Sequence, residues 1–312
     1  MKFWVGVTDN AWFRHLKSIG ADEVNFWQPS AKAPFVNAPK GMPFLFKLKR
    51  PYNHIAGGGY FVTYTQLPLA VAWDAFGEKN GRTSFQDFRS VLVDLRDRQS
   101  TDDNVGCTIL SNTFFLDEEF WLPNPPGWSN NIVVGKYYET ANFDGMQIWS
   151  QMRDRFLTLP QEQLSLDEKV PLRAEESVAS YGAETLVQQR LGQGAFRVLV
   201  TDAYKRRCAI TGEKTLVALE AAHIVPFSRE QNHDVTNGLL LRADFHRLFD
   251  VGLVGVTPDL NVRISPRIRE AWSNGQVYYR LDGKPVAVLP ERGDMKPDRD
   301  KLKWHYENVF QA

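Results

Sequence analysis

Apolar and polar residues alternate in several short segments of the first 140 residues, the pattern expected for half-buried β-strands. These segments cover residues 2–7, 22–29 (a strand or a bend), 43–49, 55–64 and 105–115. Three stretches with helical spacing separate them: one that includes residues 12–19 and follows a capping segment at 8–10, one at 67–77, and one at 85–95 after a capping Ser84. Short strands mixed with small helices predict a small curved β-barrel with helices.

The pattern changes beyond residue 140. Residues 143–159 have the spacing of one helix, residues 160–181 are acidic, polar and typical of a linker, and residues 184–207 return to helical spacing. A short apolar strand at 238–242 then precedes a helix at 245–251, with Asp244 as its expected N-cap. The predicted fold class is α+β in two domains, 1–145 and 184–312, joined by a helix and linker at 146–183.

The composition does not indicate a function, but it argues against several classes of protein, such as disulfide-rich, zinc-knuckle and membrane-spanning proteins. The net charge is zero, so any polyanionic partner must be bound by locally concentrated positive charge. Two cysteines, Cys107 and Cys208, exclude a disulfide framework, and Thr211 stands where a Cys-x-x-Cys knuckle would place its second cysteine, so no structural zinc is expected. No leader, membrane-spanning run or phosphate-binding loop is found, which predicts a cytoplasmic protein without membrane partner or ATP.

The strongest chemical signal is a spaced set of polar residues in the C-terminal half. His223 lies within a strand-like segment at 220–226, Asn237 precedes the strand at 238–242, and His246 and Asp250 lie four apart on the following helix, facing the same way. A neutral histidine can deprotonate water near pH 7, and a divalent ion held by imidazole and carboxylate can stabilise a phosphate leaving group. A histidine alone is usually structural, but this combination predicts phosphodiester hydrolysis.

These residues and spacings resemble the HNH, or ββα-metal, nuclease family. The resemblance implies that His223 is the general base, that Asn237 braces the loop that orients it, and that His246 ligates the metal with Asp250 as a second ligand. One position departs from the family, because Ala222 stands where many members carry a further metal ligand. Water and phosphate oxygens would then complete the shell of Mg²⁺ or Mn²⁺, or of Ni²⁺ or Co²⁺, with Glu220 in support.

Four basic residues near this set are candidates for contacts with DNA phosphates. Lys205 and Arg206 belong to a cluster at the end of the helix predicted at 184–207, and Arg242 and Arg247 flank the predicted site. The alternative for the cluster is a solvated helix end.

The N-terminal segments resemble the PUA-like superfamily, in particular its EVE and YTH branch, over residues 1–140. The resemblance is carried by residues 3–7, 23–27, 43–48 and 55–61. It implies a reader of modified bases, in which a flipped base stacks on aromatic walls and polar groups read its edge. Asn25, Trp27 and Trp121 are the pocket candidates and Asp9 a possible edge reader, although aromatic residues in such a domain are as often core. Residues 57–59 are three glycines, which allow either close approach of nucleic acid or a β-bulge.

Together these patterns predict a modification-dependent DNA endonuclease that senses modified cytosine (5-methyl or 5-hydroxymethyl) by base flipping and cuts with a single-metal HNH site, similar to modification-dependent restriction endonucleases. Its partner would be double-stranded DNA with modified bases, and a double-strand break would require a homodimer or two recruited monomers. Two alternatives stay open. One is a non-catalytic reader with a decayed nuclease domain, and the other is a sequence-specific nuclease acting on unmodified DNA or RNA.

Overall fold

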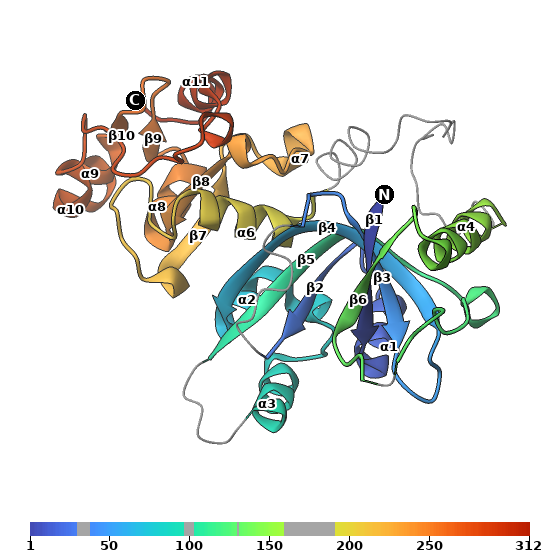
Figure 1. Ribbon diagram of the computed structural model, residues 1–312. Coiled ribbons are helices and arrows are strands. Elements are labelled where there is room, and N and C mark those ends of the chain that lie inside the picture. The colour runs from blue at the N-terminus through green and yellow to red at the C-terminus, as the bar shows by residue number, and fades with distance from the viewer. Residues whose placement is uncertain (30–37, 97–102, 130, 159–190) are drawn as a thin grey trace. The chain divides into compact units, whose positions relative to one another are not determined.

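The computed structural model describes residues 1–29, 38–96, 103–129, 131–158 and 191–312, the side chains of 153–158 excepted (Figure 1). The chain divides into two compact units, Met1–Arg190 and Leu191–Ala312. The linker predicted at 160–181 and the first turns of the helix predicted from 184 lie outside the described residues. The domain boundaries at 145 and 184 therefore stay predictions.

The first unit is built on a mixed six-stranded sheet with the order β2-β5-β4-β3-β1-β6. Its strands are β1 (Lys2–Thr8), β2 (Glu23–Gln28), β3 (Pro43–Leu48), β4 (Ile55–Pro68), β5 (Asn104–Phe115) and β6 (Gly135–Glu139). Only the β1–β3 pair is parallel among these ladders. The described pairings leave β2 and β6 as edge strands, so the curved sheet that we predicted as a barrel is open in its hydrogen bonding.

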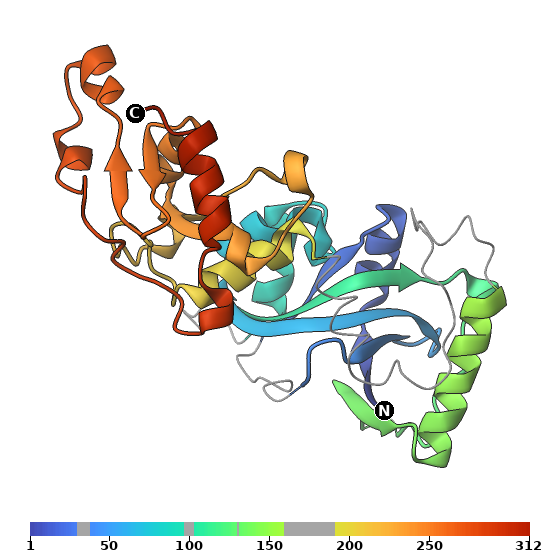
Figure 2. The ribbon, with the colours of Figure 1, turned by 90° about the horizontal axis from the view of Figure 1, so that it is seen from above.

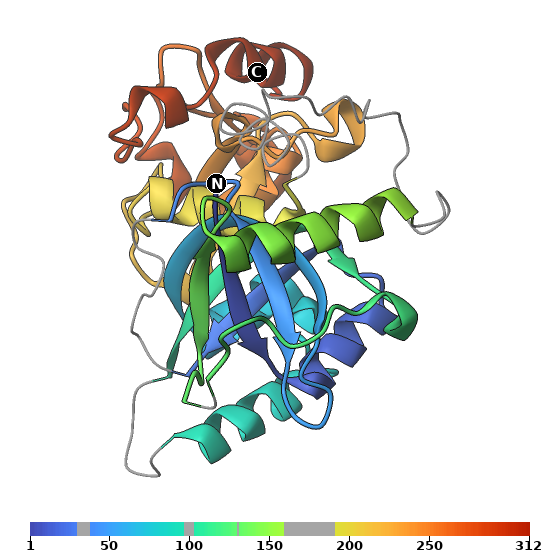
Figure 3. The ribbon, with the colours of Figure 1, turned by 45° about the vertical axis from the view of Figure 1, so that its right-hand side comes forward.

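Alternation along β1 separates two apolar layers on the faces of this sheet. Phe3 and Val5 are buried on one face, where Ile148 and Met152 of α4 (Phe143–Thr158) belong to the same cluster. Trp4 points to the other face and is buried with residues of α1 (Asn10–Ser18). Figure 3 shows α4 lying across the strands. One face of the sheet is therefore covered by α4 and the other by α1.

The three glycines of β4 permit close packing of strands. A Cβ on Gly57 would lie 2.4 Å from the carbonyl oxygen of Phe114, and one on Gly58 would lie 2.6 Å from that of Phe44. The register of β4 against β5 also shifts between Gly58 and Tyr60. Of the two alternatives for this segment, the structure supports the β-bulge, with the close approach made by the neighbouring strands.

The helices of the first unit begin where capping residues predicted them. Asp9 Oδ1 accepts hydrogen bonds from the backbone N–H groups of Ala11 and Trp12, and Ser84 Oγ accepts one from Asp87. The remaining helical elements are α2 (Leu69–Phe76), η1 (Gly77–Asn80), α3 (Phe85–Leu95) and η2 (Glu118–Phe120). The strand β4 runs to Pro68, so α2 begins two residues later than the pattern predicted.

The second unit contains two small antiparallel hairpins surrounded by helices. Its elements are α6 (Gln193–Ala203), η4 (Leu216–Ala218), β7 (Leu219–His223), α7 (Phe227–Glu230), η5 (Val235–Asn237), β8 (Gly238–Arg242), α8 (Ala243–Asp250), β9 (Val254–Val256), β10 (Val262–Ile264), α9 (Arg267–Trp272), α10 (Gln276–Tyr279), η6 (Gly293–Met295) and α11 (Arg299–Asn308). Strand β7 pairs with β8, and β9 pairs with β10. Figure 2 shows α11 lying along the β9–β10 hairpin.

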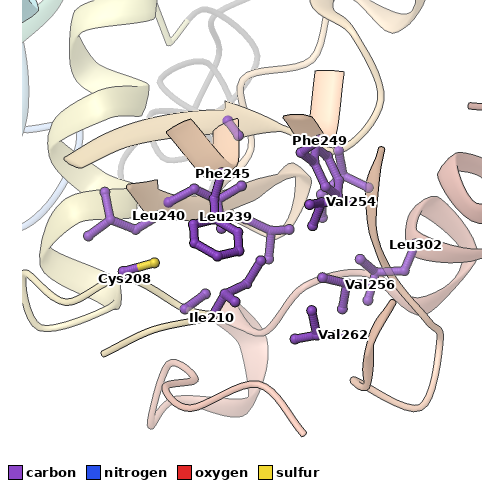
Figure 4. Packing of buried hydrophobic residues seen from close by; sticks show 14 of the residues in the cluster. Cys208, Ile210, Leu239, Leu240, Phe245, Phe249, Val254, Val256, Val262 and Leu302 are labelled. Carbon is purple, nitrogen blue, oxygen red and sulfur yellow. The ribbon is translucent and has the colours of Figure 1, made fainter. Parts of the chain in front are cut away.

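One apolar core holds the second unit together and fixes the start of the β8–α8 turn (Figure 4). Leu239, Leu240 and Leu241 of β8 are all buried in it, with Phe245 and Phe249 of α8. The helix α8 starts after Arg242, not after Asp244 as predicted, because Asp244 lies in its first turn and binds Arg242.

Cys208 occupies the place of a zinc knuckle without a second cysteine. Its sulfur is buried and accepts hydrogen bonds from the backbone N–H groups of Thr211 and Arg242, at 3.4 and 3.3 Å. The turn is thus held by hydrogen bonds and core packing.

Within the part of the chain that the structure describes, no helix is both long and apolar enough to cross a membrane.

Candidate active site

The β7–β8 hairpin and α8 place the predicted HNH residues on three neighbouring elements. His223 is the last residue of β7 and pairs with Gly238, the first of β8. A Cβ on Gly238 would lie 2.5 Å from Val200 and 3.0 Å from Phe196, both of α6. The glycine therefore allows α6 to pack closely under the end of the hairpin, and Phe196 reaches the ring of His223.

The predicted metal ligands lie together on one face of α8. His246 Nε2 is 3.4 Å from Asp250 Oδ2, one helical turn away. His246 Nδ1 is 2.7 Å from Glu220 Oε2 of β7. Partial desolvation raises the pKa of the Asp250 carboxyl, His246 opposes this shift, and the charge on Glu220 adds to it. Two carboxylates and one imidazole therefore converge between β7 and α8.

These residues fit a divalent ion held by two protein ligands. A Glu220 carboxylate that accepts the Nδ1–H of His246 leaves the Nε2 lone pair directed toward Asp250, the usual arrangement of a carboxylate, a histidine and a metal. Ala222, where the family often has a ligand, is buried in the core. The described residues hold no group of three or more His, Cys, Asp or Glu side chains suited to a metal ion. Water and phosphate oxygens would have to complete the shell, which suits Mg²⁺ or Mn²⁺.

The environment of His223 keeps its ring neutral. Its ring stacks on Phe196 with centroids 4.0 Å apart and an interplanar angle of 10°. Burial, and then electrostatic repulsion from His233 and His246, lower the pKa of His223 to about 4. The two predicted catalytic histidines lie on β7 and α8, which pack against each other. A neutral imidazole at pH 7 is the form that a general base requires.

Asn237 is fully buried and cross-links the loop between β7 and β8. Its Oδ1 accepts from the backbone N–H of Val225 at 2.9 Å, and its Nδ2 donates to the carbonyl oxygens of Val225 and Asn232 at 3.0 and 3.2 Å. One side-chain amide thus ties the residues after His223 to the far end of the loop. The hydrogen bonds match the bracing role that the resemblance implies.

His233, which lies in the loop between α7 and η5, is a residue of the site to which the sequence analysis gives no role. Its Nδ1 lies 3.0 Å from His223 Nε2, and its ring stacks on Phe227 at a centroid distance of 4.0 Å. One feature of the sequence could have indicated a role for His233. It lies between His223 and Asn237, so the loop that carries it begins and ends near the predicted site. A histidine without regular spacing on a strand or helix gives no periodic pattern that would reveal it.

Three of the four predicted phosphate contacts are engaged in ion pairs within the second unit. Lys205 pairs with Glu291, Arg206 lies 3.6 Å from Asp202, and Arg242 binds Asp244 through two hydrogen bonds of 2.6 and 2.8 Å. Arg247 is exposed on α8 next to His246 and has no ion-pair partner among the described residues. Arg247 is therefore the cation of this set most open to a phosphate.

In the first unit, three of the four predicted pocket residues gather around η1. Asn25 Nδ2 donates to Asn80 Oδ1 at 2.9 Å, and Trp27 Nε1 donates to the Asn80 carbonyl at 3.0 Å. Asp9 lies 3.7 Å from Arg82, just beyond η1, while its Oδ1 caps α1. Asn25 is fully buried, and within the described residues its Oδ1 has no hydrogen-bond partner.

Trp121 lies apart from this group. Its indole N–H donates to the carbonyl of Leu116 at 3.0 Å, and its ring meets Phe13 and Tyr52 edge-on at 6.2 and 5.4 Å. These contacts belong to the apolar layer around α1, so Trp121 packs as a partly buried core residue.

The arrangement in the second unit can bind a phosphodiester and activate water beside it. The neutral ring of His223 can accept a proton from water, and Arg247 can contact a phosphate oxygen. A divalent ion held by His246 and Asp250 would supply charge stabilisation at the phosphate and the leaving oxygen.

Comparison with known proteins gives one family match within the second unit and alignments to solved structures. Residues 208–257 match the family model described as HNH endonuclease. Among solved structures, an ASCH protein from Zymomonas mobilis aligns with a TM-score of 0.32 at 12% identity, over 47% of this chain and 94% of that chain. The "Modification dependent TagI restriction endonuclease" aligns with a TM-score of 0.29 at 14% identity, over 93% and 76%. These TM-scores assign no function.

Comparison with curated proteins gives no match. The family match spans the whole β7–α8 site, from Cys208 to beyond Asp250. Residues 208–257 are therefore an HNH endonuclease domain.

Proposed function

We propose that this protein is a modification-dependent DNA endonuclease of the cytoplasm, in which the first unit senses a modified cytosine and the second cuts the DNA. The nuclease half is supported by His246, which lies against both Glu220 and Asp250, and by His223, which ends the same strand β7 that carries Glu220. His223 takes a proton from the attacking water, and Asn237 holds the loop behind it. His246 and Asp250 hold Mg²⁺ or Mn²⁺, and Arg247 contacts the DNA backbone.

The sensing half rests on the group around η1. The ring of Trp27 is partly exposed, packs edge-on against Phe88 at 4.9 Å, and offers a surface on which a flipped base would stack. Beside it, the unpartnered Oδ1 of buried Asn25 is a hydrogen-bond acceptor that is costly to leave unsatisfied. Cytosine and its 5-methyl and 5-hydroxymethyl forms carry an exocyclic amine, the kind of donor this oxygen lacks.

Digestion of matched DNAs tests this proposal. Identical plasmids or PCR products containing cytosine, 5-methylcytosine, 5-hydroxymethylcytosine, glucosylated 5-hydroxymethylcytosine or N6-methyladenine are incubated with the protein and Mg²⁺ or Mn²⁺. Cleavage only of a cytosine-modified substrate, lost with EDTA, supports it. Equal cleavage of modified and plain DNA would leave the nuclease half standing and overturn the sensing half. A double-strand break would imply two HNH domains acting together, as in a homodimer.

One observation favours a second candidate, a non-catalytic reader of modified DNA. Ala222 is buried and apolar at the position where a further metal ligand is common, and the described residues form no three-ligand group. A reader would bind modified DNA in a gel-shift assay and leave it intact with every divalent ion tried, including Ni²⁺ and Co²⁺. Cleavage by the wild-type protein excludes it.

A further inference from the structure

His233 lies within hydrogen-bond distance of His223, the predicted general base. Its Nδ1 lies 3.0 Å from the Nε2 of His223, and the two ring centroids are 5.1 Å apart. Phe196 stacks on His223, and Phe227 stacks on His233, each at 4.0 Å. The two imidazoles thus lie edge to edge, each supported on one side by a phenyl ring. This contact orders both rings and limits the directions in which their nitrogens can point.

The brace at Asn237 fixes both members of the pair. Its amide binds Val225, two residues after His223, and its Nδ2 also donates to the carbonyl of Asn232, the residue directly before His233. The Oδ1 of Asn232 in turn accepts the backbone N–H of Asp234, directly after His233. A single buried side chain therefore sets the separation between the two histidines.

The shared hydrogen bond decides which nitrogen of His223 can act as base. A neutral imidazole has one protonated and one bare nitrogen, and each tautomer is set by the partner of the other nitrogen. Nε2 of His223 faces His233, and within the described residues Nδ1 of His223 has no hydrogen-bond partner. If His233 donated its Nδ1–H, the His223 proton would lie on Nδ1 and no bare nitrogen would remain for water. If His223 donates its Nε2–H instead, Nδ1 is bare.

We propose that His233 is the positioning residue of the general base: its Nδ1 accepts the Nε2–H of His223 and so presents the bare Nδ1 of His223 to the attacking water. This inference rests on the proposed nuclease function. When His223 takes the water proton on Nδ1, its Nε2–H becomes part of a cation, and the hydrogen bond to His233 strengthens. His233 thus fills the place that a carboxylate or carbonyl fills behind the base in other catalytic pairs.

Two substitutions of the same residue separate an acceptor from a mere packing ring. His233→Phe keeps an aromatic ring to stack on Phe227 and removes the acceptor. His233→Asn loses the ring and places an amide oxygen near the position of Nδ1. On cleavable DNA at saturating Mg²⁺, we expect His233→Phe to lower kcat by on the order of 10²-fold with KM unchanged, and His233→Asn to keep kcat within about tenfold of wild type. Thermal unfolding of each variant checks that it folds.

A structural role predicts the opposite order, because the ring would matter and the acceptor would not. Wild-type kcat in His233→Phe, or a loss in His233→Asn as large as in His233→Phe, would overturn the proposal. The readout that needs no variant and no cleavage is the ¹⁵N spectrum of the metal-free protein with labelled histidine at neutral pH. His223 should be protonated at Nε2 and bare at Nδ1, and the reverse tautomer overturns the proposal. If wild-type protein cuts no DNA, the proposed function fails while this spectrum still decides the role of His233.

Discussion

The two candidate sites of this protein differ in what holds their side chains. At the HNH site, His223, Asn237 and His246 contact polar partners on neighbouring elements, and the spacing in the sequence places all of them. In the first unit, Trp121 packs in the apolar layer, and Asp9 caps a helix. Only Asn25 and Trp27 share a partner, Asn80. Fixed spacing of polar residues thus predicts which side chains share a site, whereas aromatic residues in strands indicate a core as readily as a pocket.

We expect the largest loss of DNA cleavage when the imidazole of His246 is removed. His246→Ala should lower DNA cleavage by on the order of 10³-fold or more, because it removes a metal ligand and leaves Glu220 without its partner. Plasmid nicking at several Mg²⁺ and Mn²⁺ concentrations measures it, with DNA binding followed separately by gel shift. Cleavage near the wild-type rate would show that the metal, if one is used, is held elsewhere.

Substitution of Glu220 should have a smaller effect than loss of His246, and the effect should be on metal affinity. Glu220→Gln removes the charge that accepts the Nδ1–H of His246, so the Mg²⁺ needed for half-maximal cleavage should rise about 10–100-fold. Glu270→Gln, an exposed carboxylate on α9, is the matched control and should leave the metal titration unchanged. Equal titrations for wild type and Glu220→Gln would remove Glu220 from the site.

The core beneath the HNH site should carry an acid-labile component of stability. His305 is buried, stacks on Phe249 at 3.7 Å, and burial lowers its pKa to about 4, although a bond to the Phe249 carbonyl opposes the shift. The unfolded chain, with a pKa near 6.5, takes up more protons between these values, so stability is lost as pH falls through this window. The loss at pH 5 should be about 2 kcal/mol.

Urea unfolding at pH 7 and pH 5 checks this, with His305→Phe as the variant that keeps the stack on Phe249 but cannot titrate. The variant should lose less free energy of unfolding between the two pH values than wild type. An identical pH dependence in both proteins would mean that His305 is not held neutral by burial.

Substitution in the proposed base-sensing unit should have the smallest effect on cleavage. It should change only the selectivity for modified over plain DNA. Trp27→Ala should remove the preference for modified over plain DNA and leave the rate on plain DNA within a few-fold, because Trp27 lies in the unit without the HNH residues. Trp73→Ala is the matched control: the Trp73 ring lies against the same Phe88, with centroids 6.2 Å apart, and within the described residues it forms no hydrogen bond to Asn80. Selectivity that survives Trp27→Ala would move the pocket away from η1.

Most of the elements followed from the sequence. The helix Phe85–Leu95 and the strand Gly238–Arg242 were predicted with the bounds observed, because capping residues, spacing and burial all agree there. The open order of the six-stranded sheet did not follow, since strand pairing over long distances leaves no local pattern. The contact between His233 and His223 could not be predicted for the same reason. It depends on the conformation of a loop that the buried Asn237 amide holds by hydrogen bonds.

The proposed nuclease activity depends on His223 activating water for phosphodiester hydrolysis beside a divalent ion. The most direct measurement is nicking of a supercoiled plasmid with modified cytosine by wild type, His223→Ala and His15→Ala, in Mg²⁺ or Mn²⁺ and in EDTA. His223→Ala should lose on the order of 10²–10⁴-fold in rate while its melting temperature stays near that of wild type, and His15→Ala should cut normally. Metal-dependent cleavage by a folded His223→Ala at the wild-type rate would contradict the account.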